Sequence, residues 1–307
     1  MTTSVTPAET PAQAAAPARA GLTPTDLSLV LMAVIWGANF SAVKVGARMF
    51  QPLAFNATRI VLGTVAMFAV AAAIGGRWPA RREARALIGL GALGNGLYQI
   101  FFIEAVSRTP VANVAIVLAS TPVWLALIGQ ARGTDRIPPR GWAGIAISVA
   151  GIAMVVFGGA GSTEGRHSFT GDLLALACVA CWVLYTISLR PLIHAAEPLH
   201  LHALTMLGGA VPISLVAIPQ LATTPWTEIP ATGWALLFYG SFAAIGFAYI
   251  LWYRGLRLLG PTRTAMYANL QPMVALVVAA IVLREIPSAL QVSGAACTVA
   301  GVLLTRS

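Results

Sequence analysis

Lys44, Arg59 and Glu104 are ionisable side chains inside long apolar stretches of this sequence, and these three could carry chemistry. Charges placed inside a membrane are costly and usually mark the pathway of a substrate or an ion. The two bases could hold the carboxylate of a small substrate, with Glu104 completing a charge cluster at one end of the membrane. Alternatively, Lys44 and Arg59 extend to the lipid headgroups, and Glu104 pairs with Arg108 four residues later.

Aromatic and amide side chains form a second group in the same stretches. Trp36, Phe40 and Lys44 are spaced at i, i+4 and i+8, so they share one face of a helix. Buried amides and phenols need hydrogen-bond partners, which a polar cavity and its substrate would supply. For any single aromatic residue, helix packing is the alternative. The predicted lining residues are Trp36, Asn39, Phe40, Tyr98, Gln99, Trp182, Tyr185, Tyr249 and Gln271.

Two prolines, Pro122 and Pro272, lie within apolar stretches. Each removes a backbone donor and frees a carbonyl group one turn earlier. They are therefore candidate gate residues, together with Glu104. The pattern is equally typical of hinges and of fixed kinks.

One segment has the spacing of an enzyme motif. His167 and Asp172 match the HxxxxD pattern of glycerolipid acyltransferases, in which the aspartate orients the histidine as a general base. The segment stands in a short loop without a substrate-binding block, so a membrane-embedded acyltransferase is the alternative function rather than the main one. Cys178 and Cys181 match CxxC but lack further ligands, and we expect them to be packing residues. We expect no enzyme activity, no metal and no cofactor.

The composition indicates that lipid surrounds most of the elements that carry these residues. The 307 residues are 58% hydrophobic and 9% charged, whereas about a quarter of the residues of a soluble domain are charged. A membrane-spanning helix needs roughly 20 apolar residues. Ten such stretches are predicted, at about 27–47, 53–74, 86–107, 112–130, 141–158, 172–191, 199–220, 233–253, 264–283 and 288–305.

The last five stretches repeat the pattern of the first five. Trp36 matches Trp182 at an offset of 146 residues, and Pro122 matches Pro272 at an offset of 150. Because each copy holds an odd number of spans, the second copy must be inverted in the membrane, as in many secondary transporters. The predicted organisation is a disordered cytoplasmic tail over 1–25, a first repeat over 26–158, an outer linker over 159–170 and a second repeat over 171–307.

The net charge of +9 is best explained by membrane topology. If the N-terminus is cytoplasmic, thirteen basic residues fall in cytoplasmic segments and five in outer segments, with Arg59 left out because it lies within a span. Positive residues gather on the cytoplasmic side of membrane proteins, so both termini are predicted to be cytoplasmic. The expected partners are a small-molecule substrate and membrane lipid, not nucleic acid.

Small residues follow helical spacing in the fifth and tenth stretches, where they permit close approach of membrane helices. They serve packing within one chain or, as the alternative, contact between two chains. The predicted oligomeric state is thus a monomer or a weak homodimer. The residues are Gly144, Ser148, Gly151, Gly294, Thr298 and Gly301.

The chain resembles the EamA family of the drug/metabolite transporter superfamily over about residues 26–305. The segment Trp36-Gly-Ala-Asn-Phe40 with Lys44 is similar to the first-span signature of that family, and Pro52, Arg59, Pro122 and Glu285 match later landmarks. The second copy departs from the signature, because Tyr185 stands where Asn39 would map. The resemblance implies that spans one to four and six to nine enclose a central cavity, with spans five and ten behind them.

These observations predict an all-α membrane protein of ten spans in two inverted repeats. The resemblance implies export of small metabolites, amino-acid-like or amphiphilic, across a bacterial inner membrane by alternating access. Proton coupling occurs in relatives, but Glu104 is the one acid well inside a predicted span. Facilitated diffusion or exchange therefore stays open, as do the substrate and the direction of transport.

Overall fold

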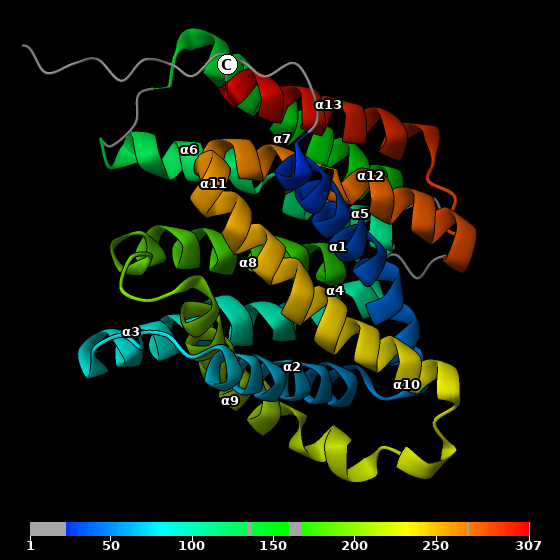
Figure 1. The fold of residues 1–307 in the computed structure, drawn as a ribbon. Coiled ribbons are helices and arrows are strands. Elements are labelled where there is room, and N and C mark those ends of the chain that lie inside the picture. The colour runs from blue at the N-terminus through cyan, green and yellow to red at the C-terminus, as the bar shows by residue number, and fades with distance from the viewer. Residues whose placement is uncertain (1–22, 134–136, 160–167, 269, 307) are drawn as a thin grey trace, which may run out of the picture.

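The computed structural model describes residues 23–133, 137–159, 168–268 and 270–306, and its regular secondary structure is entirely helical there (Figure 1). This agrees with the all-α prediction. The helices are α1 (Pro24–Met49), α2 (Pro52–Ile74), α3 (Arg81–Gly91), α4 (Tyr98–Arg108), α5 (Val111–Ala119), α6 (Thr121–Ala131), α7 (Pro139–Gly159), α8 (Phe169–Leu189), α9 (Pro198–Thr223), α10 (Ala231–Phe238), α11 (Ala248–Ala268), α12 (Gln271–Val278) and α13 (Ala289–Arg306).

Shorter elements join some of these helices. Three are π-helical, namely η1 (Ala92–Leu97), η4 (Tyr239–Phe247) and η5 (Ala279–Leu283). Two are single 3₁₀ turns, η2 (Arg190–Leu192) and η3 (Trp226–Glu228). Segments η1 and η4 continue the helices on both sides of them, so α3, η1 and α4 form one long rod, and η5 extends the end of α12.

Seven helical stretches among the described residues are long and apolar enough to cross a membrane. Apolar stretches within α7, across α12 and η5, and within α13 are shorter; they lie where the fifth, ninth and tenth spans were predicted. The seven are Pro24–Met49, Pro52–Ile74, Arg81–Arg108, Val111–Ala131, Phe169–Leu192, Pro198–Thr223 and Ala231–Gly255.

Local sequence signals account for the helix ends. Thr23 caps α1, since its hydroxyl accepts from the Asp26 amide at 3.3 Å while the Asp26 carboxylate accepts from the Thr23 amide at 2.8 Å. Pro52 and Pro198 open α2 and α9, at positions where a missing amide hydrogen costs nothing. Gly75 ends α2 with φ of 71°, a left-handed conformation that suits glycine.

The predicted loop between the eighth and ninth spans is helical in the structure. Helix α11 continues through residues 254–263, which were expected to form a loop between the eighth and ninth spans. The chain nevertheless runs one way through α10 and returns through α12 (Figure 1). Helical turns persist through the reversal because they satisfy backbone groups that a loop would leave to solvent.

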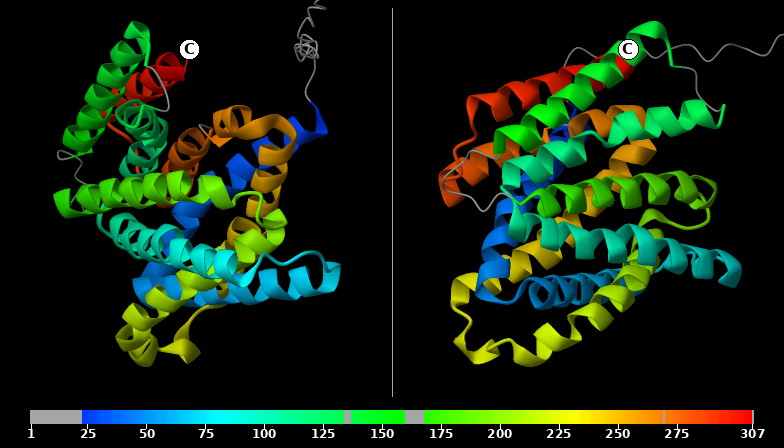
Figure 2. Two further views of the ribbon diagram at one scale, coloured as in Figure 1. Left: turned by 90° about the vertical axis from the view of Figure 1, so that its left-hand side faces the viewer. Right: turned by 180° about the vertical axis from the view of Figure 1, so that it is seen from behind.

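Helices α7 and α13 lie together at one edge of the bundle (Figures 1 and 2). Gly151 and Gly294 form their crossing, where a Cβ on Gly151 would lie 2.6 Å from the Gly294 carbonyl oxygen. Thr298 lies in the same contact. The predicted packing of these small residues within one chain is therefore confirmed.

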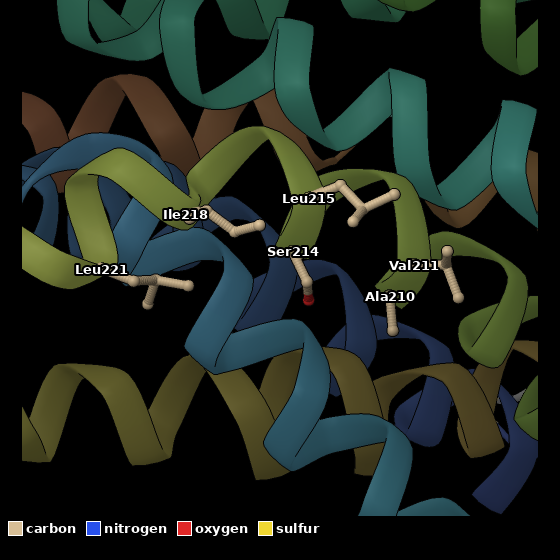
Figure 3. A pocket seen from close by; sticks show the side chains of 6 residues that line it. All are labelled: Ala210, Val211, Ser214, Leu215, Ile218 and Leu221. Atoms are coloured by element: carbon tan, nitrogen blue, oxygen red, sulfur yellow. The ribbon is translucent and has the colours of Figure 1, made fainter.

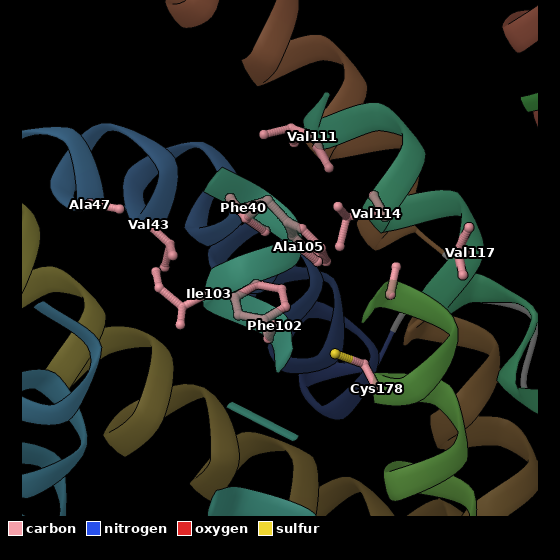
Figure 4. Close-up of a cluster of buried hydrophobic side chains, with 14 of the residues drawn as sticks. Phe40, Val43, Ala47, Phe102, Ile103, Ala105, Val111, Val114, Val117 and Cys178 are labelled. Carbon is pink, nitrogen blue, oxygen red and sulfur yellow. The ribbon is translucent and has the colours of Figure 1, made fainter. Parts of the chain in front are cut away.

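The remaining helices interlock the two halves of the chain. Helix α1 packs against α11 and α12 of the second half, and α8 packs against α4 and α5 of the first half. Helices α2 and α9 pack along each other. A buried cluster joins α1, α4, α5 and α8, with Phe40, Phe102, Val114 and Cys178 among its members (Figure 4). Cys178 is thus a packing residue, as predicted.

In both halves, a glycine packs closely against a π-helical segment of the other half. Gly63 of α2 packs against Ile245 in η4, and Gly209 of α9 packs against Asn95 in η1. The two glycines are 146 residues apart, whereas Asn95 and Ile245 are 150 apart. These offsets are the ones that relate the two copies in the sequence.

The predicted fourth and ninth spans are both broken. Ser120 separates α5 from α6, and α11 ends shortly before Leu270, 150 residues after Ser120. Pro122 and Pro272 are the second residues of the helices that follow, α6 and α12. Each proline thus opens a helix, where it leaves no helical hydrogen bond unmade.

We predict that Gly151→Ala destabilises the protein by about 1–3 kcal/mol, because the new methyl group overlaps the backbone of α13. The measurement is the thermal unfolding midpoint in detergent. Gly89→Ala is the matched control, because a Cβ at Gly89 in α3 meets nothing within 4 Å. Equal midpoints for the two variants would contradict the close crossing.

Candidate functional site

Arg59 on α2 carries a positive charge in the interior, with only 1% of its surface exposed. Its Nη1 donates to Asn39 Oδ1 at 3.2 Å. Its Nη2 donates to Asn56 Oδ1 at 2.6 Å and to Gln99 Oε1 at 3.0 Å. Within the described part of the chain, Arg59 has no carboxylate partner and its Nε has no hydrogen-bond partner. Neutral amides therefore surround a charge that no acid among the described residues balances.

Three elements build this cradle. Asn56 and Arg59 are three residues apart and therefore face the same way on α2. Asn39 comes from α1, and Gln99 from the start of α4, directly after η1. The Asn56 amide also donates to the Gln99 carbonyl oxygen at 2.7 Å, which orients the cradle. Gly240 of η4 provides the close approach, because a Cβ there would collide with the Arg59 stem.

Five of the predicted aromatic residues form a cluster beside this cradle. We call Trp36, Tyr98, Trp182, Tyr185 and Tyr249 the aromatic cluster. Trp36 lies edge-on to Tyr249 at 4.9 Å between ring centroids, Tyr98 lies 5.6 Å from Trp182, and Trp182 lies 5.4 Å from Tyr185. Arg59 is within electrostatic range of Tyr98 and Tyr249. Trp36 thus contacts Tyr249, and Trp182 contacts both Tyr98 and Tyr185.

Two other predicted lining residues, Phe40 and Gln271, lie in a buried hydrophobic cluster and at a helix crossing. Phe40 packs edge-on to Phe102 at 5.4 Å, in the buried cluster next to Tyr98. Gln271 begins α12 where α1 crosses it, and a Cβ on Gly37 would lie 2.8 Å from the Gln271 carbonyl oxygen. Gln271 therefore marks a helix crossing.

A cavity of about 930 Å³ opens near the aromatic cluster. It lies between the segments 77–80 and 193–198, and Tyr253 reaches it from α11. The Tyr253 ring is 6.3 Å from Tyr249, and the Tyr185 hydroxyl faces it. One aromatic ring thus stands between the cavity and the aromatic cluster.

A second, smaller cavity of about 450 Å³ lies along α9 (Figure 3). Its lining residues all come from α9, and Ser214 is the one polar residue among them. A surface of this composition offers almost nothing to orient a polar substrate. We therefore place the candidate site at Arg59.

Lys44 has a carboxylate partner, unlike Arg59. Its Nζ lies 2.6 Å from Glu285 Oε1 and donates to the Thr109 carbonyl oxygen at 2.9 Å. The other oxygen of Glu285 accepts from the Val111 amide at 2.9 Å. This buried ion pair ties α1 to the start of α5 and to the segment after η5.

Glu104 pairs with Arg108 in the last turn of α4, with Nε of Arg108 donating at 2.9 Å. The alternative prediction, that Glu104 pairs with Arg108, is thus confirmed. The predicted cluster of Lys44, Arg59 and Glu104 is wrong, because each of the three has its own partners.

Asp172 is almost fully buried and serves as a hydrogen-bond acceptor between helices. Thr109 Oγ1 donates to it at 3.2 Å and Asn113 Nδ2 at 3.3 Å. His167, its partner in the acyltransferase hypothesis, lies outside the described residues. Among those that are described, no group of three or more metal-ligating side chains occurs.

Three residues of this region were missed by the sequence analysis or given no partner. Asn56 supplies the shortest hydrogen bond to Arg59, and its spacing of three residues was the available signal. His202 on α9 stacks on Tyr249 at 4.3 Å, and a histidine in an apolar stretch was the signal there. Glu285 was noted as a landmark, but nothing local marked it as the partner of Lys44.

Comparison with known proteins decides the family. The model of the EamA-like transporter family matches residues 23–157 and again residues 169–307. The chain belongs to the EamA-like transporter family. With its long apolar helices, this transporter is a multi-pass membrane protein.

Relatives of this EamA-like transporter span nearly its whole length. It is 29% identical to an uncharacterised transporter of Archaeoglobus fulgidus, over 92% of this chain and 97% of the relative. It is 27% identical to a probable terminal-alkyne amino-acid exporter of Streptantibioticus cattleyicolor, over 90% of this chain and 91% of the relative. It is 25% identical to a probable amino-acid metabolite efflux pump of Salmonella typhimurium, over 90% of this chain and 92% of the relative.

The fold is similar to that of a known crystal structure. The TM-score is 0.61 at 19% identity, over 92% of this chain and 96% of the other. At this identity the likeness concerns the fold alone.

We predict that Lys44→Met lowers the free energy of unfolding by about 3–5 kcal/mol, because Glu285 is left buried without its counter-charge. Adding Glu285→Gln, which keeps an acceptor for the Val111 amide, should recover part of the loss. Denaturant unfolding in mixed micelles measures both variants.

The control for this prediction is Arg108→Ala, which breaks a pair whose arginine is half exposed. It should cost less than about 1 kcal/mol. Equal stability of the single and double variants at Lys44 and Glu285 would show that the buried pair is not coupled.

Proposed function

We propose that this chain is a secondary transporter that exports small amino-acid-like or amphiphilic metabolites across the bacterial inner membrane by alternating access. The observation that carries the proposal is the buried guanidinium of Arg59, which no carboxylate among the described residues neutralises. A membrane-embedded charge of this kind marks a substrate site. A substrate carboxylate would supply the missing negative charge.

The chemistry of the cradle suits a carboxylate. Arginine presents donors in a planar fork that matches the two oxygens of a carboxylate. Asn39 and Gln99, whose amide oxygens accept from Arg59, also carry NH₂ groups and so bring further donors to the same place, whereas the NH₂ group of Asn56 already donates to Gln99.

The aromatic cluster supports a body that is apolar or amphiphilic. Trp36 and Tyr249 come from helices α1 and α11, and Tyr98 and Trp182 from α4 and α8. Rings of this kind contact an apolar side chain over a large area and tolerate many shapes. Two relatives are named as exporters of an amino acid or an amino-acid metabolite, which favours the same class for this chain.

The two halves support alternating access by inverted repeats. The family model matches each half separately, and the matching glycines Gly63 and Gly209 pack on matching segments of the opposite half. In the predicted topology both termini and the cavity beside Tyr253 face the cytoplasm, whereas Lys44 and Glu285 lie at the outer end. The described conformation then has its outer end held by an ion pair. The substrate would approach from the cytoplasm past Tyr253.

Transport of bound compounds is the direct test. Purified protein in proteoliposomes should exchange a labelled α-amino acid that stabilises it in a thermal-shift panel, and Arg59→Met should abolish this exchange. Exchange at the wild-type rate in Arg59→Met would remove Arg59 from the site.

Asn56→Asp provides a sharper variant. The new carboxylate would lie where the amide oxygen now accepts from Arg59 at 2.6 Å, so it would neutralise the guanidinium from within the protein. We expect unchanged or higher thermal stability, but at least about tenfold weaker binding of carboxylate ligands. Asn56→Ala is the control, because it removes the acceptor without adding charge. Wild-type carboxylate affinity in Asn56→Asp would contradict the proposed anion site.

A further inference from the structure

His202 of α9 is held in one orientation and one protonation pattern. It is buried, with 1% of its surface exposed, and its ring stacks on Tyr249 at an interplanar angle of 16°. Its Nε2 lies 3.0 Å from the carbonyl oxygen of Ile245. A carbonyl oxygen can only accept, so Nε2 carries the hydrogen. In the neutral ring, Nδ1 then holds a lone pair and is an acceptor.

This acceptor is unused. Nδ1 of His202 is buried and has no hydrogen-bond partner in the described part of the structure. A buried acceptor left without a partner costs free energy, and such exceptions in native proteins call for a specific explanation. His200 also lacks partners, but its ring lies against Trp78 at 4.4 Å and not against the aromatic cluster. His202 is therefore the histidine beside the candidate site.

Segment η4 contacts both Arg59 and His202. The Arg59 stem crosses η4 at Gly240, whereas His202 reaches η4 at Ile245. These two positions are five residues apart, which is one turn of a π-helix. Tyr249 stacks on His202 and lies within electrostatic range of Arg59. His202 therefore stacks on a ring whose hydroxyl interacts electrostatically with Arg59.

The sequence repeat also relates His202 to a residue that binds Arg59. At the offset of 146 residues that relates Pro52 to Pro198, His202 corresponds to Asn56, the residue that orients Arg59. Helices α2 and α9 pack along each other, and both positions are buried. His202 thus occupies in the second copy the place that a binding-site amide occupies in the first.

We propose that Nδ1 of His202 accepts a hydrogen bond from the amino group of the substrate while Arg59 holds its carboxylate. This assignment rests on the proposed function and deepens it, because it names the substrate class as α-amino acids. A neutral imidazole suits this role, since it accepts from an ammonium group without repelling it.

Two substitutions separate recognition from structure. The amide of glutamine reaches the position of Nε2, so His202→Gln keeps a donor for the Ile245 carbonyl but lacks an acceptor at the position of Nδ1. The amide of asparagine reaches only the position of Nδ1, so His202→Asn keeps the acceptor and loses the bond to Ile245.

The probes are L-phenylalanine, L-leucine and L-methionine, each with the acid that lacks the amino group and the amine that lacks the carboxylate. Affinities are measured by thermal shift on the purified full chain. The wild type should bind each amino acid more tightly than its deamino acid. His202→Gln should bind the amino acids about tenfold more weakly, with unchanged affinity for the deamino acids. His202→Asn should keep the preference of the wild type even if its unfolding midpoint falls.

The outcomes distinguish the two proposals. A wild-type preference for amino acids retained in His202→Gln, or equal wild-type affinity for amino acids and deamino acids, would overturn the role of His202 alone. If no compound in the panel stabilises the wild type, both the role of His202 and the proposed substrate class fail. Binding of the acids that is lost in Arg59→Met but kept in His202→Gln supports the two-point site.

Discussion

The buried charge of Arg59 is the constraint around which the centre of this protein is organised. A guanidinium inside a membrane must be hydrogen-bonded, and here α1, α2 and α4 each contribute one amide oxygen to it. The close approach of η4 at Gly240 covers its stem. Because these partners are neutral, they hold the side chain in place without cancelling its charge. The guanidinium stays available to an anion.

Lys44 shows what the same kind of charge does when it is neutralised. Glu285 pairs with it directly and also accepts from the backbone of Val111, so the pair joins three elements at one end of the bundle. Removing one partner of such a pair leaves the other charge buried without a counter-charge, which strongly destabilises the fold. Lys44 thus secures the packing, while Arg59 is the base that we propose to bind a ligand. The difference between Lys44 and Arg59 is the carboxylate of Glu285, which pairs with Lys44.

The two halves place similar elements around this centre but give them different side chains. Gly63 and Gly209 allow matching close contacts with η4 and η1. Between those contacts, Asn56 orients the guanidinium on one side, whereas His202 stacks on Tyr249 on the other. The equivalent positions Asn56 and His202 therefore carry different side chains. In the proposed site, Arg59 and His202 would bind different groups of the substrate, so the substrate would bind in one direction.

The amino-acid sequence by itself determined the membrane class, the ten apolar stretches and the repeat, and it made Arg59 a candidate site residue. These follow from composition, from segment length and from the cost of a charge in lipid, which are all local properties. It also identified five rings that the structure brings into one cluster. The continuous α11 and the π-helical segments could not be read from it, because apolar residues are compatible with any of these helical forms.

Only the tertiary structure decided which polar groups meet. Lys44 and Glu285 are far apart in the sequence, and so are His202 and the Ile245 carbonyl. In a water-soluble helix, an apolar stripe shows which face is buried, but a membrane helix is apolar on every side. Helical spacing therefore grouped residues on a face without showing what that face would contact. Close packing at small residues such as Gly63 and Gly240 set those contacts, and with them the partners of each charge.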